Sequence, residues 1–115
     1  VQALFNEMGR LARRPWVMLS AGAGMSEFET ILRYAYGAGA SGYLAGRAIW
    51  LEAFSHFPDW AAIESGLRGE ASVYMKRLGD LTDAHARPWH KSPFFGGTAS
   101  PEPADGSFRA AYSGF

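Results

Sequence analysis

Apolar positions follow two different spacings along this chain of 115 residues. Over residues 1–12 they recur at helical intervals, which predicts an amphipathic helix. Residues 16–19 are apolar without interruption, as is typical of a parallel strand that is buried on both faces. Residues 42–45 form a second short apolar run and predict a second strand. The pattern therefore predicts a helix over residues 1–12, a strand over residues 16–19 and a second strand over residues 42–45.

The segment between the two strands has the pattern of a helix with defined ends. Ser26 and Glu29 stand in the Ser-x-x-Glu spacing of a capping box, which predicts that the helix starts at Ser26. Gly37 or Gly39 is expected to cap its carboxyl end, because glycine readily takes the left-handed conformation found there. A strand, a helix and a second strand in this order indicate a parallel βαβ unit.

Helices are also predicted after the second strand. A short helix is expected to open at Arg47, and a further helical stretch is expected to begin near Pro58. Gly66 and Gly69 are expected to break that stretch. Residues 70–86 carry apolar residues at helical spacing and predict a final long helix.

Two short strands alone would leave open edges and one uncovered sheet face. We therefore expect an α/β fold in which residues 1–90 form the C-terminal part, the last two βα units, of a TIM (β/α)8 barrel that continues before Val1. Residues 91–115 are rich in Gly and Pro and are predicted to form a tail, either disordered or loosely docked. Its aromatic residues, which could instead anchor on a neighbouring subunit, are Phe94, Phe95, Phe108, Tyr112 and Phe115.

Composition narrows the class of protein. Eleven basic and eleven acidic residues leave no net charge, so nothing favours nucleic acid or an acidic membrane as a partner. The short basic cluster Arg10, Arg13 and Arg14 is interpreted as a solvated helix end. Cysteine is absent, which excludes disulfides and thiolate chemistry and fits a cytoplasmic protein. No apolar run approaches the roughly 20 residues that span a bilayer.

Small residues follow both strands and are suited to holding a phosphate group. Gly22 after the first strand and Gly46 after the second allow a close approach to the backbone, and Ser20 supplies a hydroxyl group. Arg47 adds a permanent charge at the start of a helix, whose free N–H groups favour anions. Neighbouring parallel strands lie about 4.8 Å apart, so the two turns could share one anion. The alternative is that the glycines form ordinary turns and that Arg47 makes a surface salt bridge.

The segment Gly22-Ala23-Gly24 does not form a dinucleotide-binding motif. The third glycine of that motif is replaced by Glu27, and no acidic residue follows at a strand end about 20 positions later. We therefore expect no dinucleotide cofactor.

Candidate catalytic residues are scarce. His56, His85 and His90 fall in a loop, a helix end and the tail rather than after a strand, so no metal site or catalytic triad is predicted. Lys76 and Lys91 are expected to be solvated, whereas a Schiff-base lysine is usually buried at a strand end. No catalytic residue is therefore assigned within the chain.

Three segments resemble a known family. Residues 15–22 (PWVMLSAG), residues 38–50 (AGASGYLAGRAIW) and Arg87-Pro88-Trp89 look like the C-terminal part of the tagatose 1,6-bisphosphate aldolase family. That family includes sulfofructosephosphate aldolases and aldolase-like domains of sugar and inositol catabolism. The resemblance covers roughly residues 1–90, and the combination of segments is more specific than the Gly-Arg pair alone.

The resemblance implies a class I aldolase in which a lysine on strand six forms a Schiff base with dihydroxyacetone phosphate, without a metal or other cofactor. Ser20 and Gly22 would match the phosphate turn after strand seven, and Gly46 and Arg47 the turn after strand eight. In the sulfosugar branch Arg47 would also lie near the sulfonate end. A homo-oligomer is expected. The alternative is an aldolase-like domain that binds a phosphate ligand or a partner without catalysis.

Overall fold

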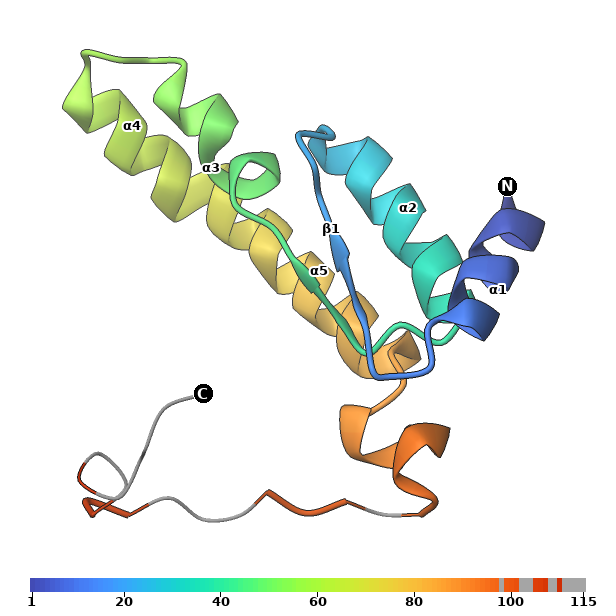
Figure 1. Cartoon of the computed structure of the whole chain (residues 1–115). Helices are drawn as coiled ribbons and strands as arrows, with labels where there is room; N and C mark the ends of the chain where they lie inside the picture. The colour runs from blue at the N-terminus through green and yellow to red at the C-terminus, as the bar shows by residue number, and fades with distance from the viewer. Residues whose placement is uncertain (98, 102–104, 108–109, 111–115) are drawn as a thin grey trace.

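The computed structural model describes residues 1–97, 99–101, 105–107 and 110. Within these residues the chain alternates helices and strands in the expected order (Figure 1). The elements are α1 (Gln2–Leu11), β1 (Val17–Leu19), α2 (Met25–Gly37), β2 (Gly42–Leu44), α3 (Arg47–Phe54), α4 (Trp60–Gly66), the π-helical turn η1 (Leu67–Ala71), α5 (Ser72–His85) and two 3₁₀ turns, η2 (Trp89–Lys91) and η3 (Pro93–Phe95). None of the described helices has both the length and the hydropathy needed to cross a bilayer.

The two strands pair in parallel, with Val17 opposite Gly42 and Leu19 opposite Leu44. Two further backbone bonds extend the ladder: Ser20 N–H donates to the Leu44 carbonyl over 3.0 Å, and Ser41 N–H donates to the Trp16 carbonyl over 2.8 Å. Helix α2 makes the crossover between the strands. The predicted parallel βαβ unit is therefore present.

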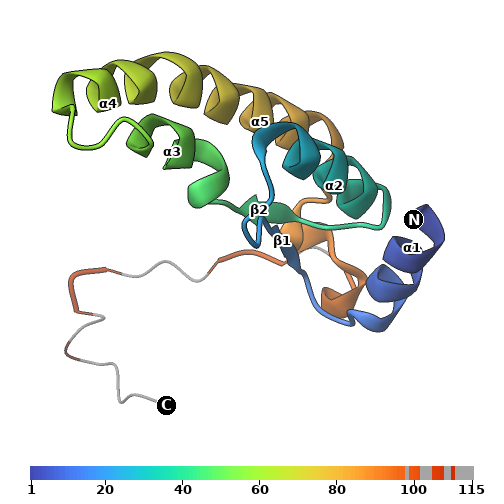
Figure 2. The same ribbon diagram turned by 90° about the horizontal axis from the view of Figure 1, so that it is seen from above.

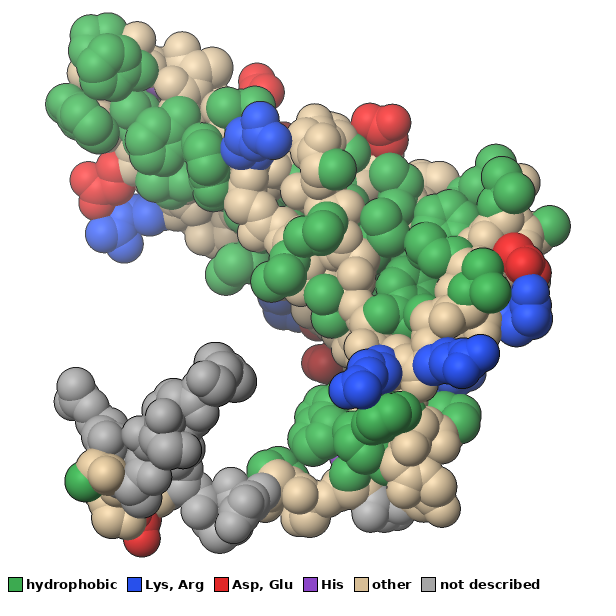
Figure 3. Space-filling view, in the orientation of Figure 1, with side chains coloured by type: hydrophobic (Ala, Val, Ile, Leu, Met, Phe, Trp, Pro, Cys, Tyr) green, Lys and Arg blue, Asp and Glu red, His purple; other side chains and the backbone are tan. Residues whose placement is uncertain are grey.

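The two faces of this small sheet differ. Met18 and Tyr43 point into the core, where the Tyr43 ring meets Phe28 edge to face at 6.1 Å. Helices α2 and α5 both lie on this side of the strands (Figure 2). On the other face Val17, Leu19 and Leu44 are 45%, 58% and 59% exposed. This second face, which we call the bare face, lies over the middle of the molecule in the space-filling view (Figure 3).

The core lies between α2 and α5. Its largest fully buried side chains are Phe28, Leu32, Tyr74 and Leu78, each apolar one contributing roughly 1.5–3 kcal/mol through burial. The Tyr74 hydroxyl donates to the Met25 carbonyl over 2.7 Å, so the one polar atom of that buried ring is satisfied. These contacts fix α5 against the start of α2.

The predicted capping box at the start of α2 is wrong. The helix begins at Met25, one residue early, because Gly24 takes the extended N-cap conformation and no side chain caps the helix. Glu29 instead binds Arg33 over 2.8 Å and Arg77 of α5 over 3.2 Å. At the other end Gly39 has a φ of +90°, in agreement with the predicted glycine cap.

The expected break at Gly66 and Gly69 is also wrong. The chain remains helical through η1, so that α4 leads directly into α5. Gly66 serves packing instead, because a Cβ there would lie 3.0 Å from the Cβ of Ala53 on α3. Glycine at this position lets the two helices approach closely.

The segment after α5 folds back against the start of β1. Ser92 is buried, and the Arg14 guanidinium lies 4.7 Å from the centre of the Phe94 ring. Phe95 packs edge to face on Phe94 at 5.1 Å and remains partly exposed. The other aromatic residues expected to anchor the tail, Phe108, Tyr112 and Phe115, lie outside the described residues.

Candidate functional site

The turn after β1 is tight and leaves its backbone open. Ala21 and Gly22 have φ values of 49° and 91°, and Ala23 N–H closes the turn on the Ser20 carbonyl over 2.9 Å. Ser20 is 8% exposed, and its N–H group is used in the sheet. Of the two predicted residues in this turn, Gly22 is therefore the one that presents its backbone to solvent.

The turn after β2 leads straight into α3. Gly46 is the N-cap, and its carbonyl accepts the N–H groups of Ile49 and Trp50 over 2.8 and 3.2 Å. In the described part of the chain the N–H groups of Arg47 and Ala48 donate to no backbone carbonyl. Such free N–H groups, with the positive end of the helix dipole, favour an anion.

Arg47 brings the two turns together. A Cβ placed on Gly22 would lie 3.7 Å from the Arg47 Nη2 atom, so the guanidinium lies beside the first turn. Gly22 and Arg47 line one groove of about 420 Å³, whereas Ser20 and Gly46 do not. Arg47 forms no ion pair with a carboxylate of residues 1–97. The surface salt bridge considered as the alternative is therefore not seen there.

Other charged residues line the same groove, and the sequence patterns did not identify them. Glu52 comes from α3, Glu70 from η1 and Arg77 from α5. Arg77 is held by its ion pair with Glu29 and lies over the Tyr74 ring, 5.4 Å from its centre. The groove thus carries two arginines and two glutamates. No local spacing could have identified these residues, because their meeting depends on how three helices pack.

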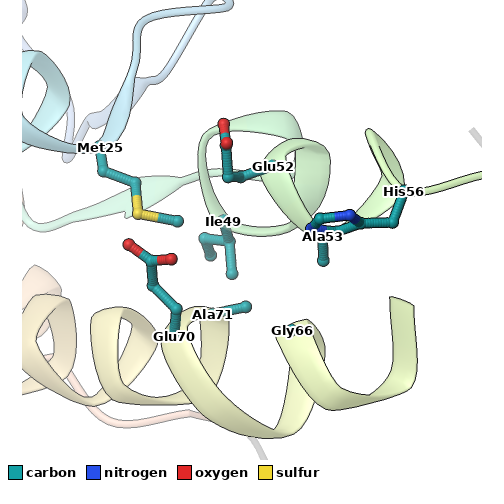
Figure 4. A pocket seen from close by; sticks show the side chains of 8 residues that line it. All are labelled: Met25, Ile49, Glu52, Ala53, His56, Gly66, Glu70 and Ala71. Carbon is teal, nitrogen blue, oxygen red and sulfur yellow. The ribbon is translucent and has the colours of Figure 1, made fainter. Parts of the chain in front are cut away.

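A small crevice of about 40 Å³ adjoins the groove between α3 and η1 (Figure 4). Its floor is apolar, with Ile49, Ala53 and Ala71, and the Glu70 carboxylate points toward Met25 at the start of α2. Among the described residues no three His, Asp or Glu side chains gather closely enough to hold a metal ion. The crevice therefore extends the groove, and its described residues do not form a metal-binding cluster.

Neither lysine of the chain, nor the Tyr74 phenol, is among the residues that line the groove, whereas Glu52 and Glu70 there and His56 in the adjoining crevice are groups that can transfer protons. The Lys76 ammonium pairs with Asp80 over 2.8 Å and is largely exposed, and Lys91 is exposed as well. Burial raises the pKa of the Tyr74 hydroxyl, and the nearby Glu29 charge raises it further, so this phenol stays neutral at ordinary pH. A Schiff-base lysine is therefore not found among the described residues that line the groove.

No model of a known protein family matches the chain. The site is therefore defined by its geometry, a mixed-charge groove at the carboxyl ends of two parallel strands.

Proposed function

We propose that this chain is the C-terminal part of a class I ketose-phosphate aldolase and that it holds the phosphate group of the substrate. The enzyme would cleave a six-carbon sugar phosphate, or a sulfosugar phosphate, to dihydroxyacetone phosphate and an aldehyde. The observation that carries the proposal is the meeting of Gly22 and Arg47 in one groove. Because this site lies at the carboxyl ends of parallel strands, it occupies the end where barrel enzymes bind their ligands.

The chemistry of a phosphate group fits these turns. The free N–H groups at the start of α3 can donate to phosphate oxygens, and the Arg47 guanidinium can donate two parallel bonds. Each charge-assisted bond of this kind contributes on the order of 1.5–3 kcal/mol. Gly22 leaves room beside the guanidinium that a side chain would fill.

The bare face of the sheet supports the barrel part of the proposal. Val17, Leu19 and Leu44 are apolar yet roughly half exposed. In a closed barrel the side chains of this face would point inward, where bulky aliphatic residues fill the interior. Strands from elsewhere in a longer polypeptide would cover them and pair with the two free edges.

The catalytic lysine would come from outside these 115 residues. Lys76 is engaged with Asp80, and neither lysine of the chain lies at a strand end. The contribution of this part of the enzyme would be to hold one end of the substrate at a fixed place relative to that lysine. A cytoplasmic location is part of the same proposal.

The two glutamates of the groove favour a phosphate ester that also carries hydroxyl groups. Glu52 and Glu70 would repel a second phosphate, but their carboxylates can accept hydrogen bonds from sugar hydroxyls. A hydroxylated monophosphate ester such as dihydroxyacetone phosphate or a ketohexose phosphate therefore suits the lining better than inorganic pyrophosphate does.

The catalytic part is tested by trapping. The complete polypeptide is incubated with dihydroxyacetone phosphate, reduced with borohydride and examined by mass spectrometry for an adduct on lysine. An adduct supports the class I aldolase. Its absence, with phosphate-ligand binding retained, would instead favour the non-catalytic binding domain considered from the sequence.

The binding part is tested by calorimetry with dihydroxyacetone phosphate. Arg47→Ala should weaken binding at least about tenfold, because it removes a charge-assisted bond. Arg68→Ala is the matched control, since Arg68 is an exposed arginine that pairs with Glu64 away from the groove. Equal affinity in the Arg47 variant and the parent would remove Arg47 from the site.

A further inference from the structure

A second pocket lies at the opposite end of the sheet, at the amino ends of the strands. It has a volume of about 200 Å³ and lies where α1 passes into β1, beside the segment that follows α5. Its arginines are Arg10, Arg13, Arg14 and Arg87. In Figure 3 basic side chains gather just above the segment that follows α5.

The charge of this pocket is not balanced by its lining. Arg10 pairs with Glu7 over 2.6 Å, but the other three arginines form no ion pair within the described part of the chain. Among the described residues that line the pocket there is no aspartate or glutamate. Like charges that line one pocket repel each other, so an anion bound between them would relieve an electrostatic cost.

Two of the arginines, although exposed, each contact a neighbouring part of the chain. The Arg87 guanidinium lies flat against the backbone at Gly39, where a Cβ would come within 2.8 Å of its central carbon. The Arg14 guanidinium lies over the Phe94 ring. Side chains that are already ordered lose less conformational entropy when they bind a ligand.

One of the residues that line the pocket has a buried hydroxyl group with no partner in the described part of the chain. Ser41 lines the pocket, and its Oγ atom is buried without a hydrogen-bond partner among the described residues. A buried polar atom left unpaired costs free energy, and such atoms are rare in folded proteins. A ligand that accepts hydrogen bonds from both a hydroxyl and arginines would satisfy it.

We infer that this pocket binds a small, multiply charged oxyanion such as pyrophosphate or a phosphate monoester. Guanidinium groups match the geometry of phosphate oxygens, and the small volume of the pocket suits a free anion rather than an extended polymer. The site is separate from the groove that contains Gly22 and Arg47, because none of the described residues lines both.

The test uses the complete polypeptide carrying Arg47→Gln, so that the groove is disabled, and measures inorganic pyrophosphate binding by calorimetry at low salt. One pyrophosphate is expected to bind each chain, more weakly as sodium chloride is added. Adding Arg87→Gln or Arg13→Gln should weaken binding at least about tenfold, whereas Arg68→Gln should not change it. Arg87→Gln could disturb the fold, because Arg87 packs against Gly39. Arg13 is a solvent-exposed side chain, so a loss of binding in Arg13→Gln is not explained by misfolding.

Ser41→Ala gives an independent readout. Without pyrophosphate this variant should unfold at an equal or higher urea concentration than the parent, because an unpaired buried hydroxyl is removed. With pyrophosphate it should gain less stability than the parent. The inference is overturned if Arg47→Gln alone abolishes pyrophosphate binding, or if neither Arg13→Gln nor Arg87→Gln weakens it.

Discussion

The covered and bare faces of the two-stranded sheet carry similar residues in very different surroundings. On the covered face Met18 and Tyr43 pack against α2, beyond which Leu78 of α5 is fully buried. On the bare face Leu19 and Leu44 are more than half exposed. The difference teaches that the surrounding elements, and not residue type alone, decide burial, because equally apolar residues are covered on one face and exposed on the other.

The largest effect is expected on the covered side. Leu78→Ala should lower the free energy of unfolding by about 2–5 kcal/mol, because it leaves a cavity between α2 and α5. Urea unfolding followed by circular dichroism measures the change. A loss below about 1 kcal/mol would mean that the core is loosely packed, and the contrast between the two faces would fail.

A smaller effect is expected from Tyr74→Phe, also in the core. Loss of the hydrogen bond to the Met25 carbonyl should cost about 1 kcal/mol at neutral pH.

The same variant tests the pH dependence of stability. Burial and Glu29 raise the pKa of Tyr74 in the folded state, so the folded protein resists losing this proton. The contribution is therefore complete below the unfolded value of about 10 and is lost as the pH rises through the folded pKa. The parent should lose more stability than Tyr74→Phe between pH 8 and pH 11. Parallel curves would show that the buried phenol does not drive alkaline unfolding.

The smallest effect is expected on the bare face. Leu19→Ala is the matched partner of Leu78→Ala and should change the stability of this chain by no more than about 0.5 kcal/mol, because Leu19 already contacts water. In the complete polypeptide the same substitution should cost far more if a barrel covers this face. Equal small effects in both would contradict the proposed barrel.

Local sequence patterns predicted the order of the elements well. The uninterrupted apolar run at residues 16–19 indicated a strand buried on both faces. In the structure only one face of this strand is covered by other elements. The capping box failed because Gly24 could cap the helix by backbone conformation alone. The break at Gly66 failed because close packing on Ala53 is a second reason for glycine within a helix.

The candidate site was only partly predictable. Gly22 and Arg47 follow strands, so topology alone brings them to one edge of the sheet. Glu52 and Glu70 reach the groove only through the packing of α3 and η1. The basic pocket shows the same limit, because Arg87 lies far along the chain from Arg13 and Arg14 and joins them only when the chain folds back after α5.

The π-helical turn η1 determines how α4 is rotated about its axis relative to α5. A π turn holds one residue more than an α turn, and each residue advances an α-helix by about 100°. Without that extra residue, α4 would be rotated by roughly this angle relative to α5 and would present another side to α3. Gly66 would then turn away from Ala53. One residue in η1 thus acts as a spacer that sets the rotational register of the whole α3–α4 pair.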